Sequence, residues 1–190
     1  IWGEEGELTG NLDAKQGRDV LDYTSYTDPV TVTYDSNGSL NTTATKIGGS
    51  VIGMHEFVGG ESDEDTLVGQ RYDSTNKVWL DTLWTVEGEN EGRIDFLSTP
   101  DSIWLSGFEN LTGGESNRDT FWIRDDGTVD GVIDGGGVVT GGNPLDDADS
   151  LLLSNGDENN ALVSARQQDS DTVILSGKRI NFKNIEPIIE

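Results

Sequence analysis

The chain has 190 residues, a formal net charge of −24 and hydrophobic residues at 33% of its positions. So acidic a chain cannot neutralise rows of phosphates, which excludes nucleic acid as a partner and adhesion to anionic lipid through a basic face. No apolar run reaches the roughly 18 residues of a membrane span, so no membrane insertion is expected, and a chain without cysteine forms no disulfides.

Short runs of β-branched and aromatic residues recur along the chain between clusters of Gly, Asn, Asp and Ser. Such runs favour strands, and the clusters between them favour tight turns. In chain order the expected strands are 30–34, 78–80, 83–86, 103–105, 121–123 and 173–175. Helical periodicity is missing, so the sequence predicts an all-β chain that is folded in spite of its charge.

Two pairs of segments resemble each other. Residues 59–67 (GGESDEDTL) return as 113–121 (GGESNRDTF), and 8–13 (LTGNLD) return in similar form as 129–134 (VDGVID). A short turn-strand-turn unit cannot bury its apolar side alone, so stacking of successive units must supply the core. The repeats therefore predict a right-handed parallel β-solenoid, like a β-helix or β-roll, built of irregular stacked coils.

The spacing from the glycine pair to the apolar residue is the same in both segments. It therefore also predicts that Leu67 and Phe121 point into one apolar interior from equivalent corners. The alternative fold is an antiparallel β-sandwich, because Asn37-Gly38, Asp126-Gly127 and Asn155-Gly156 are signals for tight hairpin turns.

Residues 1–190 are predicted to form a single β-repeat domain, a segment of a longer array. The chain starts at Ile1 without a leader, and its last residues match only the first part of a repeat. Both ends are therefore expected to be open to stacking by a further repeat. Uncovered solenoid ends recruit further strands. The expected partners are neighbouring repeats, or copies of the chain associated head to tail into a filament.

Three stretches carry a resemblance to a known family: 108–114 (FENLTGG), 119–121 (DTF) and 127–137 (GTVDGVIDGGG), with 180–186 (INFKNIE) similar to the first of them. Together they resemble the degenerate repeats of giant bacterial surface proteins, the RTX-like and filamentous-haemagglutinin-like adhesins. The resemblance implies a secreted or cell-surface location and a structural, adhesive role in a rod. The tandem GGxGxDxUx calcium half-sites of RTX proteins are absent, so that family's calcium roll is not carried over.

Calcium is still expected as a cofactor that stiffens the fold, because acidic turns are where a β scaffold supplies the six to eight oxygens that calcium takes. The candidate ligands are Asp63, Asp65, Asn117, Asp119, Asp146, Asp147 and Asp149. The alternative is that these turns are solvated, with Asp and Asn present for local hydrogen bonds.

The rival function is a carbohydrate-binding module that recognises surface glycans. Tryptophan rings can form a platform for sugars, and the candidates are Trp79, Trp84, Trp104 and Trp122. Aromatic residues inside β-branched strands are more often core, which is the competing interpretation.

No enzyme activity is predicted, because the single histidine, His55, aligns with Glu109 at a position expected to face solvent. The enzyme alternative is a polysaccharide lyase on a β-helix, which needs a cation to stabilise an enolate and a base to take the proton. A concave cleft where basic side chains and carboxylates converge would favour it. The basic candidates are Arg93, Arg118, Arg124, Arg166, Lys178 and Arg179.

Overall fold

The computed structural model describes residues 5–34, 41–69, 81–97, 100–124, 126–137, 148–154, 170–175 and 177–185. Every regular element within these ranges is a strand, and the ranges hold no helix that could span a membrane. The all-β prediction is therefore confirmed for the described residues.

The strands form two sheets. The nine-stranded sheet, called the large sheet below, has the order β1 (Leu12–Asp13), β5 (Val51–Ile52), β4 (Asn41–Ala44), β3 (Thr31–Tyr34), β7 (Thr66–Val68), β11 (Asn110–Thr112), β13 (Val132–Asp134), β16 (Lys178–Lys183), β15 (Ser170–Leu175). The seven-stranded sheet, called the small sheet, has the order β14 (Ser150–Ser154), β12 (Asp119–Arg124), β8 (Thr82–Gly88), β9 (Glu91–Phe96), β10 (Ser102–Ser106), β6 (Glu56–Val58), β2 (Val20–Asp22).

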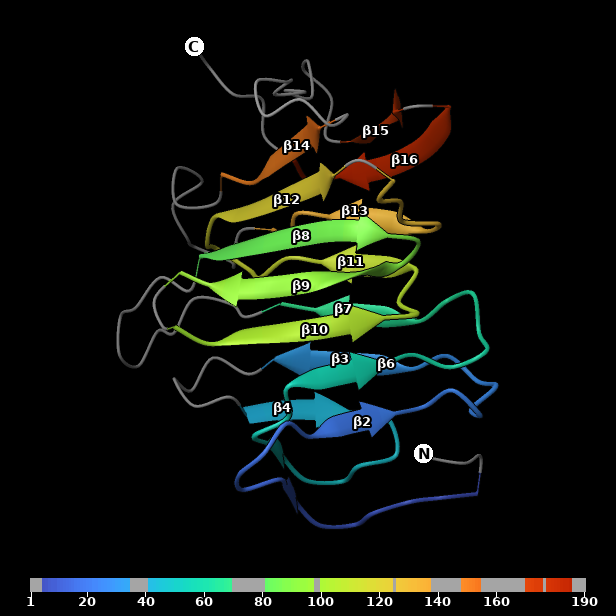
Figure 1. The fold of residues 1–190 in the computed structure, drawn as a ribbon, viewed down its shortest axis with the longest axis vertical. Helices are drawn as coiled ribbons and strands as arrows, with labels where there is room; N and C mark the ends of the chain where they lie inside the picture. The colour runs from blue at the N-terminus through green and yellow to red at the C-terminus, as the bar shows by residue number, and fades with distance from the viewer. Residues whose placement is uncertain are drawn as a thin grey trace.

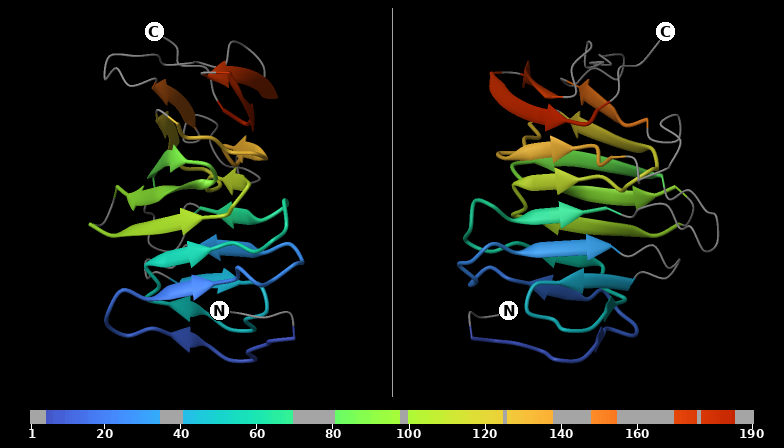
Figure 2. Two further views of the ribbon diagram at one scale, coloured as in Figure 1. Left: turned by 45° about the vertical axis from the view of Figure 1, so that its right-hand side comes forward. Right: turned by 180° about the vertical axis from the view of Figure 1, so that it is seen from behind.

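The two sheets lie face to face with the apolar core between them (Figures 1 and 2). Alternation along each strand sends one set of side chains inward and the other outward. On β12, Phe121 and Ile123 are fully buried while Trp122 between them is half-buried on the outer side. Phe121 stacks on Trp84 of the neighbouring strand with ring centroids 5.2 Å apart.

The chain crosses from one sheet to the other after most strands. The elements β6, β10, β12 and β14 lie in the small sheet, whereas β7, β11, β13 and β16 lie in the large one. Strands that return to the same sheet pair in parallel, as β7 does with β11 and β11 with β13. The view from behind in Figure 2 shows these strands stacked one above another.

Antiparallel hairpins interrupt this parallel stacking, so both sheets are mixed. They join β3 to β4, β4 to β5, β8 to β9, β9 to β10 and β15 to β16. Asn90, in the turn between β8 and β9, has a φ of 51°, a backbone conformation that asparagine adopts more readily than most residues. The sheets thus differ from a purely parallel solenoid and equally from an antiparallel sandwich.

The predicted hairpin signals have different outcomes. Asn37-Gly38 falls between the antiparallel strands β3 and β4 but lies outside the described residues, as does Asn155-Gly156. Asp126-Gly127 makes no hairpin, because it leads from β12 in the small sheet to β13 in the large one.

Leu67 and Phe121 are both fully buried in the same core, as the repeat predicts. They lie on different sheets, however, Leu67 on β7 and Phe121 on β12. The first repeated turn leads from the small sheet to the large one, and the second leads in the opposite direction. The expectation of equivalent corners was wrong, because the same turn sequence serves a crossing in either direction.

The glycine that opens each repeated turn lies against the backbone of the next layer. A Cβ atom on Gly59 would lie 1.8 Å from the carbonyl oxygen of Gly107, and one on Gly113 would lie 2.3 Å from that of Gly135. The N–H of Gly59 also donates to the carbonyl of Ser106 at 2.8 Å. Glycine is required here because the backbones at these corners approach too closely for a side chain.

Candidate functional site

Asp65, in the first repeated turn, is an acceptor for two separate parts of the backbone. Its Oδ2 accepts the N–H of Gly60 within the turn, and its Oδ1 accepts the N–H of Val30, which leads into β3, at 2.8 Å. Its own N–H donates to Oε2 of Glu109 at 3.2 Å. Asp65 therefore satisfies buried backbone donors and links three neighbouring layers of the chain.

Asp119 repeats this arrangement in the second turn. Its Oδ2 accepts the N–H of Gly114, and its Oδ1 accepts both the N–H of Thr82, at 3.2 Å, and the Thr82 hydroxyl. Its N–H in turn donates to Oδ1 of Asp149 at 2.7 Å. Thr82, Asp119 and Asp149 thus join the starts of β8, β12 and β14, and we call these residues, together with Asp65 and Glu109 of the first turn, the carboxylate ladder.

The ladder places carboxylates where water is excluded. Burial raises the pKa of Asp119 to about 7, against the hydrogen bonds from Thr82, and the nearby Asp81 carboxylate adds to the rise. Burial also raises the pKa of Asp65 and of Glu109. The neutral acid is thus favoured at these positions relative to a solvated carboxyl group.

The predicted calcium ligands form no cluster of metal-binding acids within the described ranges. Asp65 and Asp119 belong to different sheets, and Asp63 is exposed. The structure does bring Asn117, Asp119 and Asp149 together, with Asn117 donating its amide N–H to Oδ1 of Asp119 at 3.0 Å. The oxygens of Asp65 and Asp119 accept N–H groups in this structure, and calcium binding by these residues stays a prediction from the sequence.

Asp146 and Asp147, the remaining acids of the predicted set, lie outside the described residues. Calcium binding there stays a prediction from the sequence.

A second polar ladder escaped the sequence analysis. The side-chain amide of Asn90 donates to Oε1 of Glu109 at 3.3 Å and to Oδ2 of Asp130 at 3.0 Å, and its Oδ1 accepts the N–H of Asp130 at 2.9 Å. In the sequence, Asn90 is recognisable only as an asparagine in a two-residue turn between strands. Such an asparagine indicates a positive φ, but the sequence does not show which groups its side chain contacts.

The four candidate tryptophans have different surroundings. Trp84 is fully buried and donates its indole N–H to the Thr82 hydroxyl at 2.6 Å, so it is core and offers no face to a sugar. Trp79 lies outside the described residues. Trp104 and Trp122 both lie on the outer face of the small sheet, where Trp104 is 36% exposed.

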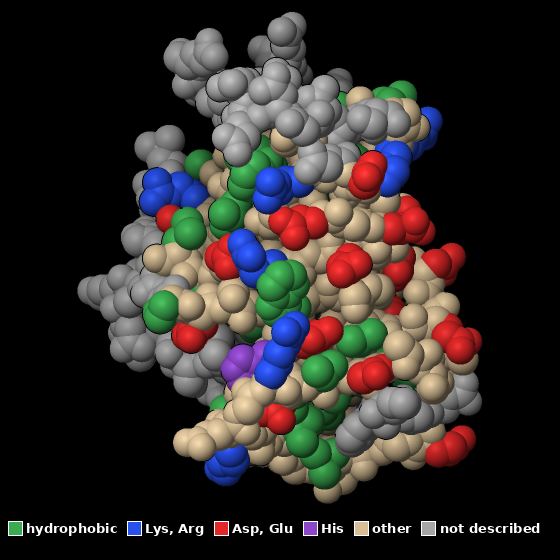
Figure 3. All heavy atoms as spheres, viewed as in Figure 1, with side chains coloured by type: hydrophobic (Ala, Val, Ile, Leu, Met, Phe, Trp, Pro, Cys, Tyr) green, Lys and Arg blue, Asp and Glu red, His purple; other side chains and the backbone are tan. Residues whose placement is uncertain are grey.

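Each of these two outer rings carries arginine side chains. The guanidinium carbons of Arg18 and Arg93 lie 5.8 and 5.5 Å from the ring centroid of Trp104, and that of Arg124 lies 4.7 Å from Trp122. Cations at these distances are attracted to the π face. Figure 3 shows hydrophobic and basic side chains running down the middle of this face, with many acidic ones toward its right edge.

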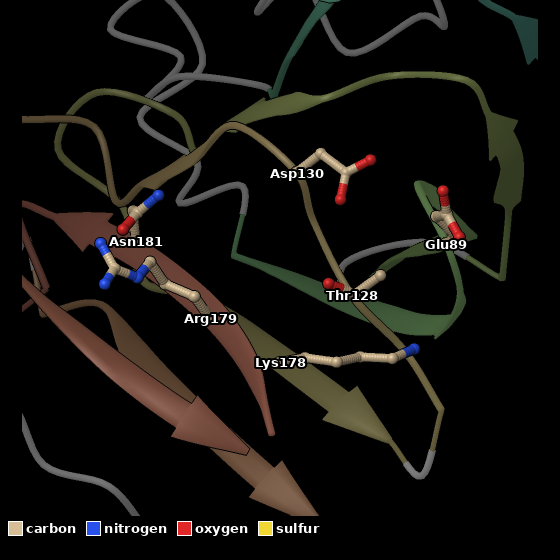
Figure 4. A pocket seen from close by; sticks show the side chains of 6 residues that line it. All are labelled: Glu89, Thr128, Asp130, Lys178, Arg179 and Asn181. Atoms are coloured by element: carbon tan, nitrogen blue, oxygen red, sulfur yellow. The ribbon is translucent and has the colours of Figure 1, made fainter. Parts of the chain in front are cut away.

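A polar pocket of about 390 Å³ lies where β16 meets the turns after β8 and β12. Its lining residues are Glu89, Thr128, Asp130, Lys178, Arg179 and Asn181 (Figure 4). The two basic side chains come from β16, and the two carboxylates come from the turns. Lys178 Nζ donates to the backbone carbonyl of Asp126 at 2.6 Å, which holds one side of the pocket.

The other basic residues named for a lyase are held in ion pairs on the surface, Arg93 with Asp95, Arg118 with Asp81 and Arg124 with Glu87. Arg166 lies outside the described residues. His55 is exposed, and its Nδ1 accepts the N–H of Asp19 at 3.4 Å. Among the basic residues named for a lyase that the structure describes, Lys178 and Arg179 line the polar pocket.

Comparison of the chain with known protein families, with curated proteins and with solved structures finds no match.

Proposed function

We propose that the chain is a structural segment of a secreted or bacterial cell-surface protein, a rod-like right-handed β-solenoid with antiparallel hairpins inserted between its coils. The carboxylate ladder is the observation that carries this proposal. Each of its acids accepts an N–H group from a neighbouring layer, so these side chains hold the layers together. The surface location and the adhesive role rest on the resemblance of the repeats to bacterial adhesins.

The edges of the two sheets support stacking on further repeats or on a second copy. At one end these are β1 and β2, and at the other β15 and β14. Edge strands offer unpaired backbone groups to an incoming strand. In repeat proteins each added interface contributes to the stability of the whole.

A tandem fusion of two copies tests the structural proposal. If the copies stack, the fusion melts in one transition at a higher temperature than the single chain. A fusion of one copy to an unrelated domain is the control. Two copies that melt independently, at the temperature of the single chain, would contradict the proposal.

Calcium stiffening is a separate prediction that concerns Asp146 and Asp147. A ligand that binds only the folded state raises its melting temperature, so millimolar calcium should raise the midpoint by several degrees over a chelator. The double variant Asp146→Asn, Asp147→Asn should lose this response, whereas Asp13→Asn, which alters an exposed acid outside the predicted calcium set, should retain it. Equal midpoints in calcium and chelator would show that these acids bind no calcium.

The polar pocket favours a second candidate function, cleavage of an acidic polysaccharide by elimination. Arg179 would neutralise the carboxylate of a uronate, and Glu89 or Asp130 would take the proton from the adjacent carbon. The electron pair then forms a carbon–carbon double bond as the glycosidic oxygen leaves and is protonated.

This second candidate predicts an unsaturated uronate product, which is followed by its ultraviolet absorbance. Product formed from polygalacturonate or alginate, and lost in Arg179→Ala but not in Arg118→Ala, would support it. Lack of product from both polymers would remove it, and would leave the structural proposal untouched.

A further inference from the structure

Arginine side chains cover the two tryptophan rings on the outer face of the small sheet. The guanidinium groups of Arg18 and Arg93 lie over the Trp104 ring, and that of Arg124 lies over the Trp122 ring. Figure 3 shows basic and hydrophobic side chains at the surface along the middle of this face. A molecule that approaches these rings therefore meets guanidinium groups first.

Each of these arginines also has a carboxylate beside it, and the three ion pairs, with N···O distances of 3.0–3.1 Å, are Arg18–Glu56, Arg93–Asp95 and Arg124–Glu87. The paired side chains keep 28–64% of their surface exposed. A guanidinium group has five N–H donors, so one that is held in an ion pair can still donate to a second carboxylate.

The net charge of the chain makes this face different from an ordinary acidic surface. Two copies that each carry a charge of −24 repel each other, and the repulsion is least where carboxylates are already paired with arginines. The outer face of the small sheet is therefore a face on which a second copy can approach in spite of its charge.

The charges next to Trp104 change sign from one side of β10 to the other. Trp104 pairs in register with Glu56 of β6 on one side and with Arg93 of β9 on the other. Each of these neighbours lies one strand spacing, about 4.8 Å, from Trp104. The row thus places a carboxylate and a guanidinium group at equal distances on opposite sides of β10.

Such a row is complementary to itself. Sheets that pack face to face keep their strands nearly aligned, and in a two-fold dimer the same patch serves both copies. If the two-fold axis runs along β10, the side chain one strand away on one side faces the side chain one strand away on the other. We infer that the outer face of the small sheet is the interface of a symmetric dimer, in which Glu56 of each copy pairs with Arg93 of the other.

The size of this contact predicts a weak dimer. With the axis on β10, the overlap covers five strands of the small sheet, β8, β9, β10, β6 and β2. At about 4.8 Å per strand and five residues of about 3.3 Å, the flat area is roughly 400 Å² on each copy, to which the relief of the side chains adds. Interfaces of this size belong to transient complexes, so we expect a dissociation constant on the order of 10–100 μM.

The dimer goes beyond the proposed structural role and uses a different part of the molecule. Stacking of repeats joins the sheet edges at the two ends, β1 and β2 at one and β15 and β14 at the other, whereas the dimer joins the outer faces of two small sheets. Rods can therefore pair side by side while they also continue end to end. The side-by-side pair closes at two copies, but end-to-end stacking has no fixed number.

Sedimentation equilibrium from about 5 μM to 1 mM chain tests the dimer. We expect the average mass to rise from that of one copy, 20.5 kDa, to a plateau at twice this value. Glu56→Arg places two arginines opposite each other, and Arg93→Glu does the same with two glutamates. Because like charges that face each other across an interface repel, each variant alone should dimerise at least about tenfold more weakly.

An equimolar mixture of the two variants tests the pairing itself. In a mixed pair both arginines of one copy face both glutamates of the other, so the mixture should regain the dimer. Glu61→Arg, which makes the same charge change at an exposed acid between β6 and β7, is the control and should dimerise as the unaltered chain does. Equal melting temperatures show that the variants are folded.

Four results would overturn the inference: a single copy at every concentration, an unchanged dimer in either variant alone, a mixture that associates no more than its components, or growth past two copies without a plateau. The last of these would favour end-to-end stacking instead. None of them alters the melting of the tandem fusion, so failure of the dimer and failure of the structural role are distinguished.

Discussion

Gly59→Ala is expected to lower the free energy of unfolding by about 3 kcal/mol, which corresponds to a fall in melting temperature of roughly 6–12 °C for a chain of this size. The new methyl group would lie 1.8 Å from the carbonyl oxygen of Gly107, far inside van der Waals contact. The two backbones cannot separate freely, because the Gly59 N–H donates to the carbonyl of Ser106 at 2.8 Å.

Gly10→Ala is the control for this variant. A Cβ atom on Gly10 would have no heavy atom within 4 Å among its non-neighbouring residues in the described part of the chain. Its melting temperature should match that of the unaltered chain. If Gly59→Ala were equally stable, the close approach of the two turns would not exist in solution.

Acidification from pH 8 to pH 5 should stabilise the fold, by on the order of 2–3 kcal/mol from Asp119 alone. The pKa of this carboxyl group is about 7 in the folded chain and 3.8 in its ordinary state, because burial disfavours the charged form. Between these two values the folded state binds more protons than the unfolded state, so stability rises as the pH falls. Asp65 and Glu109, whose pKa values burial also raises, act in the same direction.

Two variants test whether Asp119 is the source of this pH dependence. Asp119→Asn carries no charge at any pH, so the rise in stability between pH 8 and pH 5 should be much smaller, as measured by urea unfolding. Asp13→Asn should leave the rise unchanged, because the hydrogen bond from Lys15 lowers the pKa of the exposed Asp13 and moves its titration below this range. An unfolding free energy that stays constant between pH 8 and pH 5 would show that Asp119 is solvated.

The sequence predicts a local feature correctly where the backbone conformation requires one particular type of residue. The repeated Gly-Gly turns were recognised, and so was the burial of Leu67 and Phe121. The direction of each crossing was not, because a glycine pair followed by an aspartate satisfies the same N–H groups whichever sheet comes next. The hydrogen bonds of the acidic turns were not predictable either, since the sequence does not show that the oxygens of Asp65 and Asp119 face N–H donors.

The sequence does not show on which face of the sheet each tryptophan lies. Trp84 and Trp122 both sit in apolar runs, but Trp84 pairs in register with Phe121 and Trp122 pairs with Thr85. A difference of one position in register puts the first ring in the core and the second on the outer surface. Strand β9 was missed altogether, because the first of its three inward positions is Gly92 and its pairing depends on the hairpin at Asn90.

The inserted hairpins lengthen one sheet at a time. β11 and β13 are direct neighbours in the large sheet, whereas β10 and β12, which precede them in the chain, are separated in the small sheet by β9 and β8. Two additional strand widths on one side amount to roughly 10 Å. Nearer the N-terminal end of the stack the additional strand belongs to the large sheet instead, where β4 lies between β3 and β5. Each hairpin therefore adds strands to one side of its layer, so that gaining or losing one would tilt the axis along which the layers stack while the repeated turns keep their sequence.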